Sequence, residues 1–149
     1  MNIYFAASIR AGRGDVFIYK KILPMLQKHG TVLTAHVADE HVSSEGEAGL
    51  SDQQIFSRDM AWLRSADVLI AEVSIPSLGV GYEIGQARSM NIPVLCLYRA
   101  ANRKKLSGMI SGDPEIHTIC YREADSLQTR IDNFFQSLHS SSAGLDSNP

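Results

Sequence analysis

Short apolar runs alternate with longer segments of helical composition along most of the chain. The apolar runs, which predict β-strands, cover residues 2–7, 31–34, 67–73, 93–98 and 116–121. The segments that predict helices cover residues 16–29, 51–65, 82–90, 106–110 and 126–138. Strands that alternate with helices are typical of βαβ units, so the sequence predicts an α/β fold with a mostly parallel sheet.

The expected architecture is a single flavodoxin-like domain, with a doubly wound, five-stranded, mostly parallel sheet flanked by helices. A chain of 149 residues favours one domain. Five short strands fit the flavodoxin-like class better than a full dinucleotide-binding fold. We expect the folded domain to cover residues 1–138, and the polar residues 139–149 to form a disordered tail.

Composition excludes several classes of partner. The formal net charge is −2, with 14 basic and 16 acidic residues, which argues against binding a nucleic acid polymer. No apolar run approaches the roughly 18 residues that span a membrane, and the first residues do not resemble a signal peptide. Cys96 and Cys120 lie in apolar segments and are interpreted as buried hydrophobic residues of a reducing compartment. These features predict a cytoplasmic location, with the nucleus as a second one.

Residues 77–85 (Ser-Leu-Gly-Val-Gly-Tyr-Glu-Ile-Gly) directly follow the third predicted strand. The glycines predict a turn, which would place Glu83 in the first turn of a helix, beyond the carboxyl end of a central strand. Ligands bind in this crevice in open α/β sheets. A helix N-terminus favours a negative side chain by about 0.3–1 kcal/mol. We therefore expect Glu83 to be ionised and able to attack an electrophilic sugar carbon.

Asp59, in the preceding helix, is the carboxylate that we pair with Glu83. Cleavage of a glycosidic bond needs a carboxylate at the anomeric carbon and an acid for the leaving group. The alternatives are that Asp59 only pairs with Arg58 or Arg64, and that Glu83 only contacts the helix dipole. Tyr4, in the first strand, is either a core residue or a hydroxyl that orients the two carboxylates.

The end of the first strand carries the parts of a phosphate site. Ser8, Arg10 and Ser77 offer hydroxyls and a guanidinium, and Gly79 offers backbone amides. The alternative is that residues 8–10 form only a polar loop. The glycines at 79 and 81 match part of a GxGxxG pattern, but Ile84 occupies the place of the third glycine, so NAD binding is not expected.

Residues 4–10, 59–63, 66–68 and 77–85 together resemble the 2′-deoxynucleoside 5′-phosphate N-hydrolases of the nucleoside 2-deoxyribosyltransferase superfamily. The resemblance covers about residues 2–138. It implies hydrolysis of the N-glycosidic bond of a deoxynucleoside 5′-monophosphate, which yields a free base and 2-deoxyribose 5-phosphate. It also implies that no metal or organic cofactor takes part.

The same resemblance implies a role for each site residue. Glu83 is the nucleophile that forms a glycosyl-enzyme, Asp59 assists departure of the base and activation of water, and Tyr4 positions them. The substrate contacts that the resemblance implies come from Ala7, Ser8, Ile9, Arg10, Gly12, Ser77, Gly79 and Ser107. Ser107 is expected to reach the site from the neighbouring subunit of a homodimer. Ala7 stands where the family has a glycine, and we expect the ligand to tolerate the additional methyl group.

Two other functions stay open from the sequence. The transferases of this superfamily usually carry an aspartate in the loop that here covers residues 74–77. An aspartate about 4 Å from a phosphate dianion would cost about 2–8 kcal/mol, so the serines of this loop favour a monophosphate substrate. A deoxyribosyltransferase and a non-catalytic nucleotide-binding module remain the alternatives, and the preferred base is not readable from the sequence.

Overall fold

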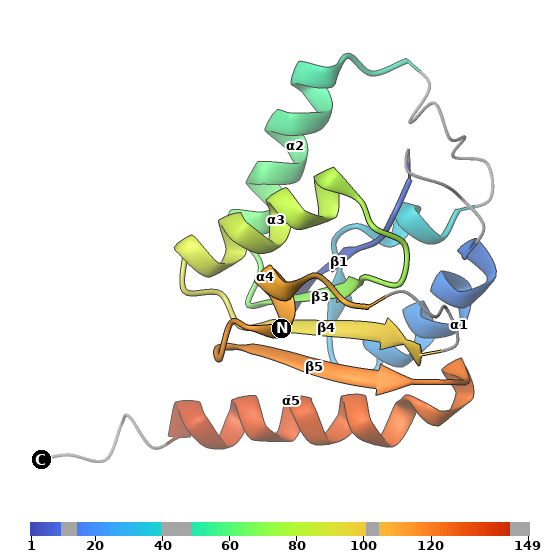
Figure 1. Ribbon diagram of the computed structural model, residues 1–149. Helices are drawn as coiled ribbons and strands as arrows, with labels where there is room; N and C mark the ends of the chain where they lie inside the picture. The colour runs from blue at the N-terminus through green and yellow to red at the C-terminus, as the bar shows by residue number, and fades with distance from the viewer. Residues whose placement is uncertain (10–14, 40–48, 101–104, 144–149) are drawn as a thin grey trace, which may run out of the picture.

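A five-stranded sheet lies between two layers of helices (Figure 1). The computed structural model describes residues 1–9, 15–39, 49–100 and 105–143. The strands are β1 (Asn2–Ala6), β2 (Thr31–Val32), β3 (Val68–Glu72), β4 (Val94–Arg99) and β5 (Ile116–Tyr121). The helices are α1 (Val16–Gln27), α2 (Asp52–Arg64), α3 (Leu78–Ser89), α4 (Gly108–Ser111) and α5 (Gln128–Ala143), with 3₁₀ turns η1 (Ala35–Ala38) and η3 (Ala124–Ser126).

The strand order is β2-β1-β3-β4-β5, and every neighbouring pair is parallel. This order confirms the flavodoxin-like prediction, and the sheet is wholly rather than mostly parallel. The chain runs from β1 outward to β2 and then returns to add β3 on the other side of β1. The connections after β1 and β3 therefore diverge, which opens a crevice at their carboxyl ends.

Successive residues of each strand pack into two different cores. On β1, Ile3 and Phe5 join the cluster beneath α1 and α5, whereas Tyr4 and Ala6 join the cluster beneath α2 and α3. Side chains of a strand alternate between faces, and both faces of this sheet are covered by helices. This arrangement explains why the central strands form continuous apolar runs in the sequence.

Helix α3 begins at Leu78, four residues earlier than predicted. Ser77 caps it, because its hydroxyl accepts a hydrogen bond from the backbone N–H of Val80 at 3.4 Å. Gly79 and Gly81, which we expected to form a turn, are therefore helical. Glu83 lies in the second turn, so its predicted place in the first turn, where the helix dipole acts, is wrong.

Other local predictions have mixed outcomes. Helix α2 begins where predicted, behind a capping box in which Ser51 accepts from the N–H of Gln54 and the Gln54 side chain accepts from the N–H of Ser51. Helix α5 extends to Ala143 and so includes residues 139–143 of the expected tail. The prediction that both cysteines are buried is wrong for Cys120, because β5 is an edge strand and exposes it.

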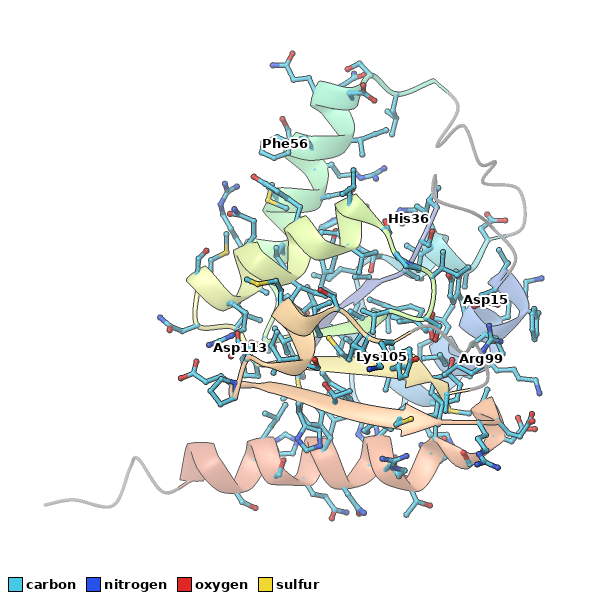
Figure 2. The ribbon with its side chains drawn as sticks, viewed as in Figure 1. Asp15, His36, Phe56, Arg99, Lys105 and Asp113 are labelled. Carbon is cyan, nitrogen blue, oxygen red and sulfur yellow. The ribbon has the colours of Figure 1, made fainter. Side chains whose placement is uncertain are left out.

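An ion pair between an aspartate and an arginine lies at each end of the sheet. Asp15 and Arg99 meet near the carboxyl end of β4, and Asp113 lies at the opposite end, before β5 (Figure 2). No helix within the described ranges is long and apolar enough to cross a bilayer. The segments that follow the carboxyl ends of β1 and β3 line a cavity, which is described below.

Candidate active site

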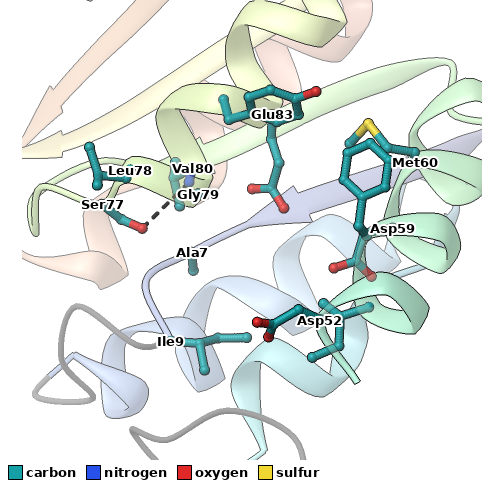
Figure 3. A pocket seen from close by; sticks show the side chains of 13 residues that line it. Ala7, Ile9, Asp52, Asp59, Met60, Ser77, Leu78, Gly79, Val80 and Glu83 are labelled. Carbon is teal, nitrogen blue, oxygen red and sulfur yellow. Dashed lines mark hydrogen bonds between the residues drawn. The ribbon is translucent and has the colours of Figure 1, made fainter. Parts of the chain in front are cut away.

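Tyr4, Asp59 and Glu83 come from β1, α2 and α3, and the structure brings them together on one face of the sheet. The Tyr4 hydroxyl donates a hydrogen bond to Oε1 of Glu83 at 2.7 Å. Asp59 and Glu83 line the same cavity, and their carboxylates point into it (Figure 3). Tyr4 is buried beneath the cavity with 1% of its surface exposed, so it acts both as a core residue and as a partner of Glu83.

The cavity has a volume of about 630 Å³ and lies in the crevice between β1 and β3. Its walls are formed by Ala7, Ile9, Asp52, Ile55, Phe56, Asp59, Met60, Ser77, Leu78, Gly79, Val80, Tyr82 and Glu83. Sites for small molecules typically have this size and combine apolar walls with a few polar groups. The carboxylates and the Ser77 hydroxyl are therefore the groups that would orient a ligand.

The protonation of Glu83 is governed by burial rather than by the helix dipole. Burial raises the pKa of Glu83 to about 7, the hydrogen bond from Tyr4 opposes this rise, and the nearby charge of Asp59 adds to it. Burial, and then the charge of Glu83, raise the pKa of Tyr4 far above its ordinary value, so Tyr4 remains a hydrogen-bond donor. Both forms of Glu83 therefore exist near neutral pH, and its ionised form does not depend on the helix dipole that we expected to favour it.

Asp59 has a different electrostatic environment. Its Oδ1 accepts a hydrogen bond from Nε of Arg58 at 2.9 Å, and Nη2 of Arg58 lies 2.8 Å away. The guanidinium group of Arg58 also stacks on the Trp62 ring, 4.6 Å from its centroid. Pairing with Arg58 and lining the cavity were alternatives from the sequence, and in the structure Asp59 does both.

The residues predicted to contact the substrate, apart from Ser107, fall into three groups. Ala7, Ile9, Ser77 and Gly79 line the cavity. Ser8 is fully buried and does not line it, and within the described ranges its hydroxyl has no hydrogen-bond partner. Arg10 and Gly12 lie outside the described residues.

Ser107 does not line the cavity that contains Glu83 of its own chain. It caps α4, where its hydroxyl accepts from the N–H of Met109 at 3.3 Å. With Ser77 it lines a second cavity of about 130 Å³ between α3 and α4. Ser77 borders both cavities and therefore marks the point where they adjoin.

Gly79 and Ala7 show how much room the backbone leaves for a ligand. A Cβ atom added to Gly79 would make only an ordinary contact, 3.8 Å from Oγ of Ser77, so protein packing does not require glycine there. Ala7 is buried in the cluster beneath α1 and α5 while also lining the cavity. The expected tolerance of its methyl group by a ligand stays a prediction.

Sequence reasoning missed one wall of the cavity, which is formed by Asp52, Ile55 and Phe56 of α2. These residues precede Asp59 by seven, four and three positions, so they share its helix face. Helical periodicity counted back from Asp59 would have found them. The rings of Phe56 and Tyr82 lie 6.3 Å apart and connect α2 to α3 at this wall.

Among the described residues, no group of three or more His, Cys, Asp or Glu side chains could hold a metal ion.

Comparisons with known proteins point to one family. The family model described as nucleoside 2-deoxyribosyltransferase matches residues 3–135. A 5-hydroxymethyl-dUMP N-hydrolase of Danio rerio is 46% identical over 141 residues, which cover 93% of this chain and 98% of the relative. The Homo sapiens protein of that name is 42% identical over 137 residues, which cover 90% and 79%. A solved CMP N-glycosidase of Clostridium botulinum has a TM-score of 0.67 at 19% identity, covering 90% of this chain and 99% of that chain, and shares the fold.

The pKa of Glu83 predicts how pH affects stability. It is about 7 in the folded protein, against 4.5 for an ordinary glutamate, so the folded state loses relative stability as pH rises through this interval. Glu83→Gln removes that loss and should raise the free energy of unfolding at pH 8 by about 1–3 kcal/mol, with a smaller gain at pH 5. Urea unfolding at both pH values measures this. Glu123→Gln, at an exposed position, is the control, and an equal gain there would contradict the explanation.

Proposed function

The chain belongs to the nucleoside 2-deoxyribosyltransferase family, and we propose that it is an N-glycosidase that hydrolyses 2′-deoxynucleoside 5′-monophosphates. The products are a free base and 2-deoxyribose 5-phosphate. The observation that carries the proposal is the hydrogen bond from Tyr4 to Glu83, in a cavity shared with Asp59. Its relatives support the hydrolase, since two proteins more than 40% identical over nearly the whole chain are named 5-hydroxymethyl-dUMP N-hydrolases.

Glu83 serves as the nucleophile in this proposal. With Oε1 held by Tyr4, Oε2 attacks C1′ of the sugar, and the bond between C1′ and the base breaks with its electron pair leaving on the base. A carboxylate with a pKa of about 7 is more basic than an ordinary glutamate, which favours bond formation once it is ionised. Water then cleaves the glycosyl-enzyme and releases the sugar phosphate.

Asp59 completes the reaction by assisting proton transfer to the departing base and activating the water. A reversed assignment has physical grounds as well, because a carboxyl group with a raised pKa often serves as the general acid. We assign the nucleophile to Glu83 because Tyr4 holds one of its oxygens, whereas Asp59 is paired with Arg58. A covalent-trapping experiment decides between the two assignments.

The 5′-phosphate is expected at the N-terminus of α3, where the first backbone N–H groups of a helix favour an anion. Ser77 and Gly79 line the cavity at this end. Arg10, which follows β1 after Ser8 and Ile9, is proposed to add a guanidinium. This arrangement explains selection of a phosphorylated substrate by local groups, despite the net negative charge of the protein.

We also propose that the protein is a homodimer in which Ser107 completes the partner's phosphate site. Leu78 and Met109 are large apolar residues with 96% and 86% of their surface exposed. They lie at the start of α3 and in α4, and these two helices border the same small cavity. We infer that both side chains belong to the dimer interface.

For location, we propose the cytoplasm, with the nucleus as a second site. Both cysteines are free, which fits a reducing compartment.

Rapid quenching during turnover of 5-hydroxymethyl-dUMP should trap the sugar phosphate on the peptide that contains Glu83, as mass spectrometry would show. Glu83→Gln should lose at least about 10³-fold in kcat and form no adduct. An adduct on Asp59 would reverse the two roles.

Free adenine added to the same assay should yield no new nucleotide, and formation of one would identify a deoxyribosyltransferase.

Gly79→Ala separates ligand space from protein packing. The variant should be as stable as the wild type or slightly more so, because alanine is favoured in a helix and its Cβ meets no close neighbour. Its KM for the monophosphate should rise by about tenfold or more, since the methyl group takes up space in the cavity. Gly85→Ala is the matched control, because Gly85 is in the same helix, an added Cβ there has nothing within 4 Å, and the residue lines neither cavity. Equal kinetics for the two variants would contradict a ligand at Gly79.

Mixing two inactive variants tests the shared site. Glu83→Gln keeps Ser107, and Ser107→Ala keeps Glu83, so a mixed dimer contains one complete site. Equal amounts that exchange subunits should recover about a quarter of wild-type activity. Light scattering should show a dimer. A monomer, or no recovery after exchange has been verified, would refute the proposal.

A further inference from the structure

A second buried carboxylate, Glu72, lies at the same edge of the sheet as the active site but on the opposite face. It is 0% exposed, at the end of β3. Its Oε1 accepts hydrogen bonds from the hydroxyls of Ser74 and Tyr121, the latter at 2.9 Å, and its Oε2 accepts from the N–H of Ser74 at 3.3 Å. The reaction described above makes no use of this group.

The bonds around Glu72 continue into two other segments. The Ser74 hydroxyl accepts a hydrogen bond from the N–H of Arg99 at 2.8 Å, and Nη2 of Arg99 donates to both carboxylate oxygens of Asp15 at 2.6 Å. Glu72, Ser74, Arg99, Tyr121 and Asp15 therefore form one continuous cluster, which we call the Glu72 cluster. It connects the carboxyl ends of β3, β4 and β5 to the residue that precedes α1.

One segment assigned to the phosphate begins at the Glu72 cluster. Ser74 is the first residue of the stretch that leads to Ser77 and Gly79. Ser74 also lines the small cavity together with Ser77 and Ser107. The bonds from Ser74 to Glu72 and Arg99 therefore hold the start of this segment in place.

Stability alone does not explain the Glu72 cluster. It contains two carboxylates and one guanidinium, and burial raises the pKa of Glu72 because the charged form has lost water. Well-packed apolar side chains in place of buried charges are often neutral or stabilising. Hydrogen bonds and ion pairs differ from apolar packing in being directional. Each bond of this cluster therefore fixes the position of one backbone segment relative to another.

We propose that Glu72 is a positioning residue for the 5′-phosphate, acting through Ser74 on the segment that carries Ser77 and Gly79. This inference rests on the proposed function. It predicts that disturbing Glu72 weakens binding of the phosphorylated sugar and leaves the chemical step nearly unchanged.

Glu72→Gln provides the test, because it keeps the size of the side chain but puts an amide where one oxygen accepts a hydrogen bond. Its KM for 5-hydroxymethyl-dUMP and its Kd for 2-deoxyribose 5-phosphate, measured by calorimetry, should both rise about tenfold, with kcat within about twofold. Tyr121→Phe removes a single donor and should raise both constants about threefold. Asp113→Asn is the control, because it breaks an ion pair with Arg88 at the opposite end of the sheet and should change neither constant.

Thermal unfolding first establishes that each variant is folded, and Tyr121→Phe carries the test if Glu72→Gln is not. Unchanged Kd and KM in the folded variants would overturn the proposal. So would a loss confined to kcat, or an equal shift in the Asp113→Asn control. A wild-type protein that binds 2-deoxyribose 5-phosphate but hydrolyses no deoxynucleoside monophosphate would refute the proposed function alone, since the Kd comparison would still decide the role of Glu72.

Discussion

The burial of Glu83 against the hydroxyl of Tyr4 is the interaction on which the site depends. A carboxylate that has lost most of its water and has one hydrogen bond from a tyrosine is basic enough to be protonated near neutral pH. The same desolvation makes its ionised form a better nucleophile than a solvated glutamate. Tyr4 can provide this environment only because β1 is a central strand whose side chains are covered by helices on both faces.

Glu72 and Glu83 show how hydrogen bonding separates a structural carboxylate from a reactive one. Both lie near the carboxyl end of β3, and burial raises the pKa of both. Glu72 is fully buried, and both of its oxygens accept hydrogen bonds, from Ser74 and Tyr121. Glu83 has Tyr4 on one oxygen and an open cavity beside it. The first arrangement holds backbone segments in place, and the second leaves an oxygen for a substrate.

Much of the fold and part of the site followed from local patterns. The alternation of apolar runs and helical segments predicted the five strands. Because residues 77–85 directly follow the third apolar run, the sequence also predicted a ligand crevice at the carboxyl end of β3. Helix boundaries were less predictable, as at α3, because the glycines there are compatible with either a turn or a first helical turn. In the structure Ser77 caps a helix that begins at Leu78, and this places Glu83 beyond the first turn.

The sequence by itself determined the elements of this protein, the approximate place of its ligand site and the candidate pair of Asp59 and Glu83. The tertiary structure decided what those groups can do. The pKa of Glu83, the pairing of Asp59 with Arg58, the wall formed by α2 and the Glu72 cluster all arise between segments or from burial. Periodicity is a property of neighbouring residues and is visible in a sequence. Desolvation and hydrogen bonding between distant residues depend on which surfaces meet, so they exist only once the chain has folded.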